Sequence, residues 1–164
     1  MGTAGGRDGD AAGMRRALAE ARKNVRRAAG GPFGACILRG GRVLAAARNT
    51  VLARRDPTCH AEVSAIRLAA RRLGTHDLSG CTICATTEPC PMCFAAIHWA
   101  GIGRIVYGTR IADVARLGFR ELTVSNRTLR RLGGSAVEIA GGALLAECRA
   151  LLRDWQALHP GVTY

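Results

Sequence analysis

Three residues that can bind a transition metal stand in two short motifs of this 164-residue chain. The first motif is His-Ala-Glu at positions 60–62, and the second is Glu-Pro-Cys-Pro-Met-Cys at positions 88–93. One imidazole and two thiolates, from His60, Cys90 and Cys93, make a three-ligand zinc site with one open coordination position. Catalytic zinc sites keep such an open position, whereas structural sites fill it. The two motifs therefore predict a catalytic zinc centre.

Glu62 lies two residues after the predicted histidine ligand and is not needed to hold the metal. Zinc lowers the pKa of a bound water toward about 7, which activates that water at neutral pH. A carboxylate beside such a water can carry protons during the reaction. We therefore predict Glu62 as the general acid-base group of a hydrolytic reaction.

Two helix N-termini are expected to bring the motifs together. On a helix, His60 and Glu62 point about 200° apart, so they share a site only if the metal lies over the helix N-terminus. The Asp-Pro-Thr turn at 56–58 places the start of a helix there. Cys90 and Cys93 fall on one face of a helix that begins at Pro91. The dipoles of both helices favour thiolate, the form of cysteine that binds metal.

A four-cysteine structural zinc site, made from Cys81, Cys84, Cys90 and Cys93, is the competing interpretation. Cys81 and Cys84 fall in a predicted strand, where positions three apart face opposite sides. The five residues between the two Cys-x-x-Cys pairs are also few beside the about 15–20 of zinc ribbons. We expect the cysteines outside the catalytic site to be small buried hydrophobic residues, namely Cys36, Cys81, Cys84 and Cys148.

Strands and helices are expected to alternate around the motifs. Apolar spacing and glycine turns predict a helix from near Asp10 to Gly30, a hairpin of strands at 33–38 and 42–47, and a helix at 61–73. A strand at 81–87, a helix at 91–100 and a strand at 104–107 should form a parallel crossover unit. A strand near 136–139 and a helix from about 142 to 158 follow.

This order predicts the α/β class, as a three-layer α/β/α sandwich with a mixed central sheet of about five strands. The length of the chain fits one domain, which we expect over residues 10–164. Residues 1–9 are rich in glycine and lack apolar periodicity, so they predict a disordered tail.

The formal net charge of +12 is carried by arginine, since Lys23 is the only lysine among 24 basic residues. The arginines are spread along the chain, which favours a general compositional preference over a selected nucleic-acid patch. Seven cysteines, an odd number, argue against a secreted disulfide scaffold. The N-terminal residues lack an apolar signal core, and no stretch reaches the about 20 apolar residues of a membrane span. We therefore expect a cytoplasmic protein without a membrane partner.

The pairing of His-x-Glu with Pro-Cys-x-x-Cys is the signature of zinc deaminases, which replace an exocyclic amino group by oxygen. The chain resembles the cytidine deaminase-like superfamily and, within it, bacterial guanine deaminases. The further motifs that carry this resemblance are Gly-Pro-Phe-Gly-Ala at 31–35, Asn49, Asp-Pro-Thr at 56–58, Trp-Ala at 99–100, Gly-Phe at 118–119 and a C-terminal Tyr.

The resemblance implies a set of substrate-binding residues around the zinc. Phe33 would stack on the purine, Asn49 would bond the ring edge, and Glu121 would replace the Asp that reads the purine amino group. A catalytic role beside Glu62 is also implied for Glu121. The remaining positions implied to contact substrate are Ala61, Trp99, which would wall the pocket, and Tyr164, which would close over it.

The resemblance also implies a zinc cofactor and a homodimer in which the C-terminal segment is exchanged in some members. Guanine, converted to xanthine and ammonia, is the expected substrate, with guanosine, cytosine and triazines as small-molecule variants. Residues 102–108 and the C-terminal helix are also similar to tRNA adenosine deaminases, so a tRNA wobble adenosine is the alternative substrate. A non-enzymatic zinc module is the third interpretation.

Overall fold

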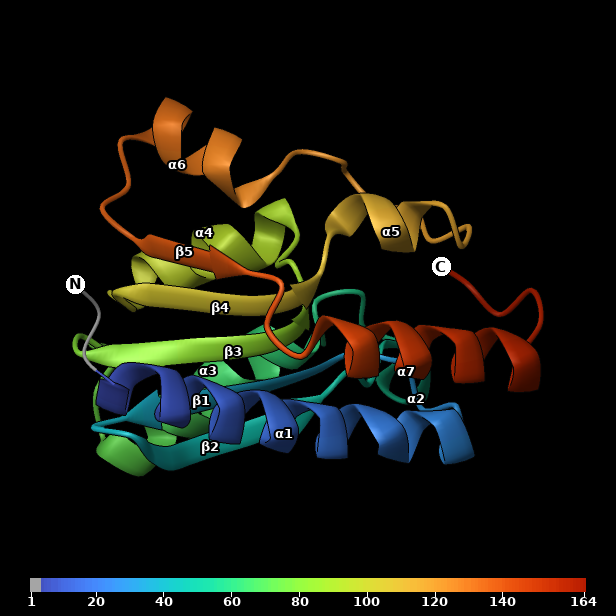
Figure 1. The fold of residues 1–164 in the computed structure, drawn as a ribbon, viewed down its shortest axis with the longest axis horizontal. Helices are drawn as coiled ribbons and strands as arrows, with labels where there is room; N and C mark the ends of the chain where they lie inside the picture. The colour runs from blue at the N-terminus through green and yellow to red at the C-terminus, as the bar shows by residue number, and fades with distance from the viewer. Residues whose placement is uncertain (1–3) are drawn as a thin grey trace.

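Five strands form one mixed sheet in the computed structural model, which describes residues 4–164, with side chains from Gly9 onward. The strands are β1 (Gly34–Arg39), β2 (Arg42–Arg48), β3 (Cys81–Thr87), β4 (Arg104–Thr109) and β5 (Glu138–Gly141). Their order across the sheet is β2-β1-β3-β4-β5 (Figure 1). β1 pairs antiparallel with both β2 and β3, while the β3–β4 and β4–β5 pairs are parallel.

The predicted hairpin and the predicted crossover are both confirmed. Gly40 and Gly41 join β1 to β2 with φ angles of 54° and 76°, in the left-handed region that glycine enters without a steric penalty. β3 and β4 are adjacent and parallel, with a helix between them in the chain. The second metal-binding motif directly follows the carboxyl end of β3.

Helices cover both faces of the sheet, which confirms the three-layer α/β/α sandwich (Figure 1). The helices of residues 4–164 are α1 (Ala4–Arg27), α2 (Val51–Arg54), α3 (Ala61–Leu73), α4 (Pro91–Trp99), α5 (Ile111–Ala115), α6 (Asn126–Gly133) and α7 (Leu145–Leu158). α1 and α7 pack on one face, where Met14 and Leu151 are buried against Cys84. α3 and α4 pack on the other face, where Ala65 and Ile97 are buried against Ile83.

Several boundaries differ from the sequence-based predictions. α1 begins at Ala4, six residues before Asp10, a start that the glycines of this segment obscured because glycine disfavours helix. Residues 1–3 of the predicted tail lie outside the described part of the chain. β5 begins at Glu138, two residues later than expected, and α7 begins at Leu145. The short helices α2, α5 and α6 were missed, since four to eight residues carry little apolar periodicity.

The cysteines outside the predicted zinc site pack as expected. Cys36, Cys84 and Cys148 are buried in the layer under α1 and α7, whereas Cys81 is buried in the layer under α3 and α4. Cys81 and Cys84 thus lie on opposite faces of the sheet and cannot bind one metal together. This placement removes the four-cysteine site.

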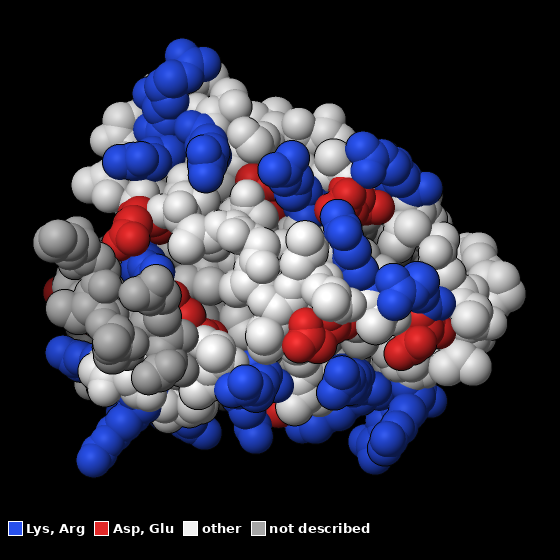
Figure 2. Space-filling model, viewed as in Figure 1, with Lys and Arg blue, Asp and Glu red and all other residues white. Residues whose placement is uncertain are grey.

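Basic side chains are dispersed over the surface, as the sequence indicated. Figure 2 shows lysine and arginine scattered over one face of the molecule, with acidic side chains between them. Within residues 4–164, no helix is both long and apolar enough to cross a membrane.

Candidate metal centre and active site

His60 caps the N-terminus of α3, at the end of a turn that is fixed by local hydrogen bonds. Asp56 Oδ1 accepts from the backbone nitrogen of Thr58 at 2.8 Å, and the backbone nitrogen of Thr50 donates to the carbonyl of Cys59 at 3.0 Å. His60 itself has extended backbone angles and Ala61 is the first helical residue. The imidazole is thereby presented at the helix N-terminus, as predicted.

Cys90 caps the N-terminus of α4 in the same way, with Pro91 in the first turn. His60 Nδ1 lies 3.6 Å from Cys90 Sγ and 3.6 Å from Cys93 Sγ. The three ligand atoms all lie within 4.8 Å of one another, and this is the one such group of His, Cys, Asp or Glu side chains in the described part of the chain.

These distances fit a zinc ion. With Zn–S bonds of about 2.3 Å and a Zn–N bond of about 2.0 Å, tetrahedral coordination holds sulfur and nitrogen ligands about 3.6 Å apart. The donor set also agrees, because thiolate and imidazole are the ligands that zinc prefers. His60, Cys90 and Cys93 would hold the ion and leave its fourth position open.

The electrostatics of the two motifs favour a metal-binding state. Contact with Cys93, together with His60, lowers the pKa of the Cys90 thiol to about 4, so Cys90 is a thiolate at neutral pH. Burial acts to lower the pKa of His60, but the neighbouring Cys90 and Glu62 raise it above its ordinary value. The Cys90 thiolate is thus ready to bind a cation, whereas contact with Cys90 and burial raise the pKa of Cys93, which would lose its proton when a metal binds.

Glu62 is buried in the first turn of α3, beside the ligands but not among them. Its Oε2 atom lies 3.6 Å from Cys93 Sγ. Burial raises the pKa of Glu62 to about 7. A carboxyl group with a pKa near neutrality exchanges protons readily at physiological pH, as a general acid-base group must.

The loop that carries Cys90 is held by two residues that the sequence analysis missed. Glu88 is buried, and its carboxylate accepts from the backbone nitrogens of Asn126 at 2.9 Å and Ile111 at 3.3 Å. The side chain of Asn126 in turn donates to the carbonyl of Pro89 at 2.6 Å. Glu88 is the first residue of the second motif, but the sequence analysis gave it no role, and nothing in the sequence linked it to Asn126, 38 residues away.

An aromatic wall stands beside the metal ligands. The rings of Phe33 and Phe119 meet edge to face with centroids 5.2 Å apart, and Phe119 meets Tyr164 in the same way at 5.5 Å. The Tyr164 hydroxyl accepts a hydrogen bond of 3.0 Å from the backbone nitrogen of Gly31. Burial raises the pKa of Tyr164, and the nearby carboxylates of Glu121 and Glu62 raise it further. The side chain of Tyr164 thus packs against residues of its own chain, next to the metal site.

Asn49 lies at the end of β2 with its side chain buried. Its Oδ1 atom accepts from the backbone nitrogen of Val51 at 3.1 Å, whereas its Nδ2 atom has no hydrogen-bond partner among the described residues. Buried amide groups are almost always paired, so this donor is available to a bound ligand, and the Tyr164 hydroxyl is near enough for Asn49 to act to lower the pKa of that tyrosine. Asn24 of α1, also missed by the sequence analysis, donates to the carbonyls of Asn49 at 2.7 Å and Gly31 at 2.8 Å.

Glu121 and Ala61 also lie at the site. Burial raises the pKa of Glu121, as does the neighbouring Cys90, while His60 lowers it, so this carboxylate is close to the ligands. Ala61 is fully buried at the first position of α3, where backbone N–H groups lack partners within the helix.

Trp99 is not where the resemblance placed it. It ends α4, whereas the metal ligands lie at the start of that helix, and it is 81% exposed. Nine residues of helix separate the two ends by about 13 Å at a rise of 1.5 Å per residue. Trp99 therefore does not wall the pocket of its own chain.

A family model described as "Cytidine and deoxycytidylate deaminase zinc-binding region" matches residues 8–109, which include both metal-binding motifs. The chain belongs to this deaminase family. The family assignment and the donor geometry agree on zinc as the cofactor and on a hydrolase that acts on amino-substituted bases. The five-stranded mixed sheet is the fold of its structural neighbours.

Guanine deaminases and tRNA-specific adenosine deaminases are among the proteins to which this deaminase is similar. Guanine deaminase of Bacillus subtilis is 42% identical over 106 residues, which are 65% of this chain and 68% of that protein. The tRNA-specific adenosine deaminase of the same organism is 30% identical over 139 residues, or 85% of this chain and 83% of that one. The structure of guanine deaminase from Nitrosomonas europaea superposes with a TM-score of 0.82 at 34% identity, covering 90% of this chain and 84% of that chain.

Proposed function

We propose that this deaminase hydrolyses the exocyclic amino group of a free purine base, with guanine as the preferred substrate and xanthine and ammonia as products. The observation that carries the proposal is the position of Tyr164, which is partly buried, packs edge to face on Phe119 and is hydrogen-bonded to Gly31 at the edge of the metal site. A site covered in this way suits a small planar base. A nucleotide flipped out of tRNA would need an open path for its sugar and phosphates.

The polar groups match the edges of guanine. The unpaired Nδ2 atom of Asn49 can donate to a ring acceptor, and the buried carboxylate of Glu121 can accept from the exocyclic amino group. The first-turn N–H of Ala61 supplies a second donor, and Phe33 offers an aromatic face for stacking. These roles agree with the similarity of the chain to guanine deaminase and to a solved neighbour, at a TM-score of 0.84, that holds 2,6-diaminopurine.

Glu62 performs the proton transfers in this proposal. When bound, zinc supplies the Lewis acidity that lowers the pKa of a water molecule toward about 7. Glu62 accepts a proton from that water as the new C–O bond forms, and it delivers a proton to the exocyclic nitrogen as the C–N bond breaks. Ammonia leaves, and the ring carbon keeps the oxygen. The pKa of Glu62, about 7, suits a group that must both accept and donate.

We further propose that the active form is a homodimer. Large apolar side chains are exposed along α4, α6 and the loop between α5 and α6, where a second copy would bury them: Met92, Trp99, Leu122 and Leu132. A partner's Trp99 could reach a pocket that the chain's own Trp99 does not, and exchange of the C-terminal segment would leave the Tyr164 contacts unchanged. Free thiols at all seven cysteines fit a reducing cytoplasm.

Deamination of a tRNA wobble adenosine is the second candidate, favoured by the similarity to tRNA-specific adenosine deaminases. Such an enzyme must hold several phosphates, so its affinity should fall steeply with salt. Cytosine, guanosine and triazines remain as small-molecule alternatives.

Ammonia release from a panel of substrates tests the proposal. The zinc-loaded protein would be given guanine, guanosine, adenine, cytosine, a triazine and a tRNA anticodon stem-loop with a wobble adenosine. We expect guanine to have the highest kcat/KM, and Glu62→Gln to abolish turnover of every substrate. Turnover of the stem-loop alone would assign the enzyme to tRNA. Wild-type rates in the Glu62→Gln protein would overturn the mechanism.

A further inference from the structure

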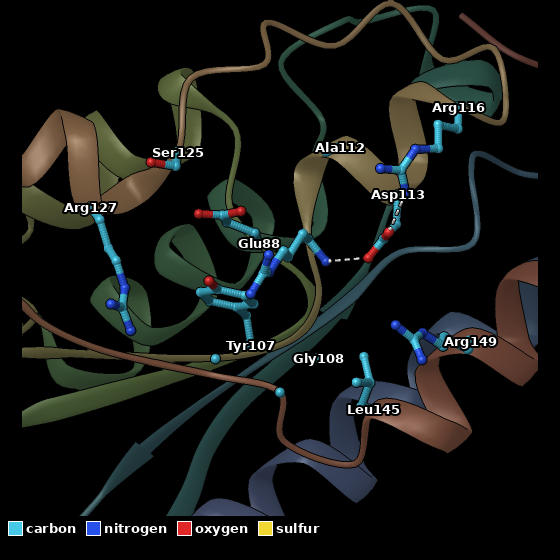
Figure 3. Close-up of a pocket in the computed structure, with 13 residues that line it drawn as sticks. Glu88, Tyr107, Gly108, Ala112, Asp113, Arg116, Ser125, Arg127, Leu145 and Arg149 are labelled. Carbon is cyan, nitrogen blue, oxygen red and sulfur yellow. Dashed lines mark hydrogen bonds and ion pairs between the residues drawn. The ribbon is translucent and has the colours of Figure 1, made fainter.

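A second cavity, of about 710 Å³, lies at the ends of β4 and β5, between α5, α6 and the start of α7 (Figure 3). Glu88 is on its wall, but none of the metal ligands lines it, and neither does any residue proposed to contact the base. The cavity is thus separate from the deaminase site. Its volume falls within the about 300–1,000 Å³ of pockets that hold small ligands.

Four arginines line this cavity, and they come from different elements. Arg110 and Arg116 flank α5, Arg127 belongs to α6, and Arg149 belongs to α7. Figure 3 shows Arg127 and Arg149 on opposite sides of the space, with Glu88 and Tyr107 between them. Arginine side chains therefore line the cavity from more than one side.

Three of the four arginines have no acidic partner. Arg116 pairs with Asp113 at 3.0 Å, but among the described residues no carboxylate lies within 4.0 Å of the side chains of Arg110, Arg127 or Arg149. Guanidinium groups that converge without a counter-charge repel one another, and a bound anion would remove that repulsion.

The two carboxylates that line the cavity, Glu88 and Asp113, already accept hydrogen bonds from other groups. Both oxygens of Glu88 accept backbone hydrogen bonds, from Asn126 and Ile111. Asp113 accepts from the backbone nitrogen of Arg110 at 3.0 Å as well as from Arg116. Four arginines against two carboxylates leave the lining with a formal charge of +2.

The start of α7 adds further donors. Leu145, the first residue of this 14-residue helix, lines the cavity together with Gly142, and no side chain caps the helix N-terminus. The N–H groups of a first turn and the helix dipole both favour an anion. Arg149 follows one turn later, on the same side of the helix.

We propose that this cavity binds a small organic phosphate that carries at least two negative charges. Arginine is suited to such a ligand because its planar fork of N–H groups matches phosphate oxygens. All four arginines are exposed, and Arg127 also lines a neighbouring hollow with Arg130 and Arg131. A small phosphate is favoured over RNA because the backbone donors at the start of α7 lie at the same cavity, and RNA is an outcome that the test separates. The proposal is independent of the substrate of the zinc site.

Calorimetric titration of the zinc-loaded, full-length protein with inorganic pyrophosphate tests the proposal. Arg127→Gln and Arg149→Gln would be compared with Arg131→Gln and Arg153→Gln, which change exposed arginines four residues further along the same two helices and outside the cavity. Zinc content before and after titration would show that pyrophosphate has not removed the metal.

We expect one pyrophosphate per chain, and a Kd that rises at least about tenfold in each cavity variant, because a charge-assisted hydrogen bond is worth about 1.5–3 kcal/mol. The control variants should bind as the wild type does. Three results would overturn the proposal: no measurable binding, equal losses in cavity and control variants, or binding that both cavity variants leave intact. A single-stranded RNA that loses affinity in the cavity variants, and that pyrophosphate does not displace, would assign the surface to RNA instead.

Discussion

The Tyr164 hydroxyl oxygen lies 3.0 Å from the backbone nitrogen of Gly31, although 133 positions separate the two residues in the sequence. The same tail is fixed by the backbone nitrogen of Arg120, which donates to the carbonyl of Tyr164 at 3.0 Å. Gly31 has no side chain to obstruct this contact, since a Cβ atom there would come within 2.9 Å of the hydroxyl. The last residue of the chain is thus part of the pocket wall.

Substitution of Tyr164 should therefore reduce activity without loss of the metal. Tyr164→Ala removes the ring that packs on Phe119 and opens the site to water, so we expect kcat/KM to fall at least about tenfold. Tyr164→Phe keeps the ring and loses one hydrogen bond of about 1 kcal/mol, so its loss should be about fivefold. Steady-state kinetics and zinc content decide the matter, and unchanged kinetics in Tyr164→Ala would show that the tail is idle.

Zinc should be present at about one ion per chain and be required for turnover. Cys90→Ser and Cys93→Ser should lose the metal, because each removes one of three ligands. Cys81→Ser and Cys84→Ser should keep it, since these thiols lie on opposite faces of the sheet. Metal analysis of the four variants, with chelation of the wild type, provides the measurement. Two zinc ions per chain, or loss of zinc in Cys81→Ser or Cys84→Ser, would contradict the single three-ligand site.

Glu62→Gln should retain zinc and fold but lower kcat at least about a hundredfold, because general acid-base transfer is typically worth 10² to 10⁴. The substitution preserves shape and removes the ability to exchange a proton. Glu121→Gln serves as the comparison, and it should raise KM more than it lowers kcat if that carboxylate reads the amino group. The opposite pattern would assign proton transfer to Glu121.

The candidate metal ligands could be predicted from sequence because they belong to two short motifs, in which residue type and spacing indicate metal binding. Turn residues predicted a helix start just after His60, and a proline predicted one just after Cys90. Both residues are N-cap residues in the structure. Element types followed from periodicity for the same reason, and the bounds predicted for α3 and β3 agree with the structure.

The support around the ligands could not be predicted, since it depends on contacts between distant segments. The Glu88–Asn126 bond joins two loops, and Asn24 looked like one more polar residue on an amphipathic helix. The exposed position of Trp99 was also missed. The resemblance implies that this residue lies at the substrate pocket, but it does not say whether the residue and the pocket belong to the same chain.

Trp99 should control self-association. It is 81% exposed, and α4 contacts α6, where Leu132 exposes 71% of its surface. Exposed patches of large apolar side chains mark interfaces, with tryptophan the most frequent hot spot. Trp99→Ser should shift the protein toward monomer in analytical ultracentrifugation. Leu158→Gln, at an exposed position on α7, is the matched control, and an equal effect of both changes would exclude a specific interface.

Asn24 should act as a positioning residue for the base pocket. Its Nδ2 atom donates to the carbonyls of both Gly31 and Asn49, so one buried amide sets the distance between the Tyr164 contact and the proposed ring-edge donor. Asn24→Ala removes this donor from both carbonyls. The Gly31 carbonyl keeps its hydrogen bond from the backbone nitrogen of Phe33, so the loss falls mainly on the Asn49 carbonyl, at a cost of about 1–3 kcal/mol in the free energy of unfolding.

We expect Asn24→Ala to lower Tm and to raise KM several-fold while zinc content and kcat change less, because Glu62 and the metal ligands belong to other elements. Asn24→Gln offers the same amide on a longer arm and tests position rather than hydrogen-bonding capacity, so it should raise KM as well. Ala28, the residue after α1, has a φ of 47° in the left-handed region, so Ala28→Gly should be tolerated and serves as a control at the same helix end that touches neither carbonyl. If Asn24→Ala lowers Tm but leaves KM at the wild-type value, the amide contributes to folding alone, and the position of Asn49 is set by its own bond to Val51.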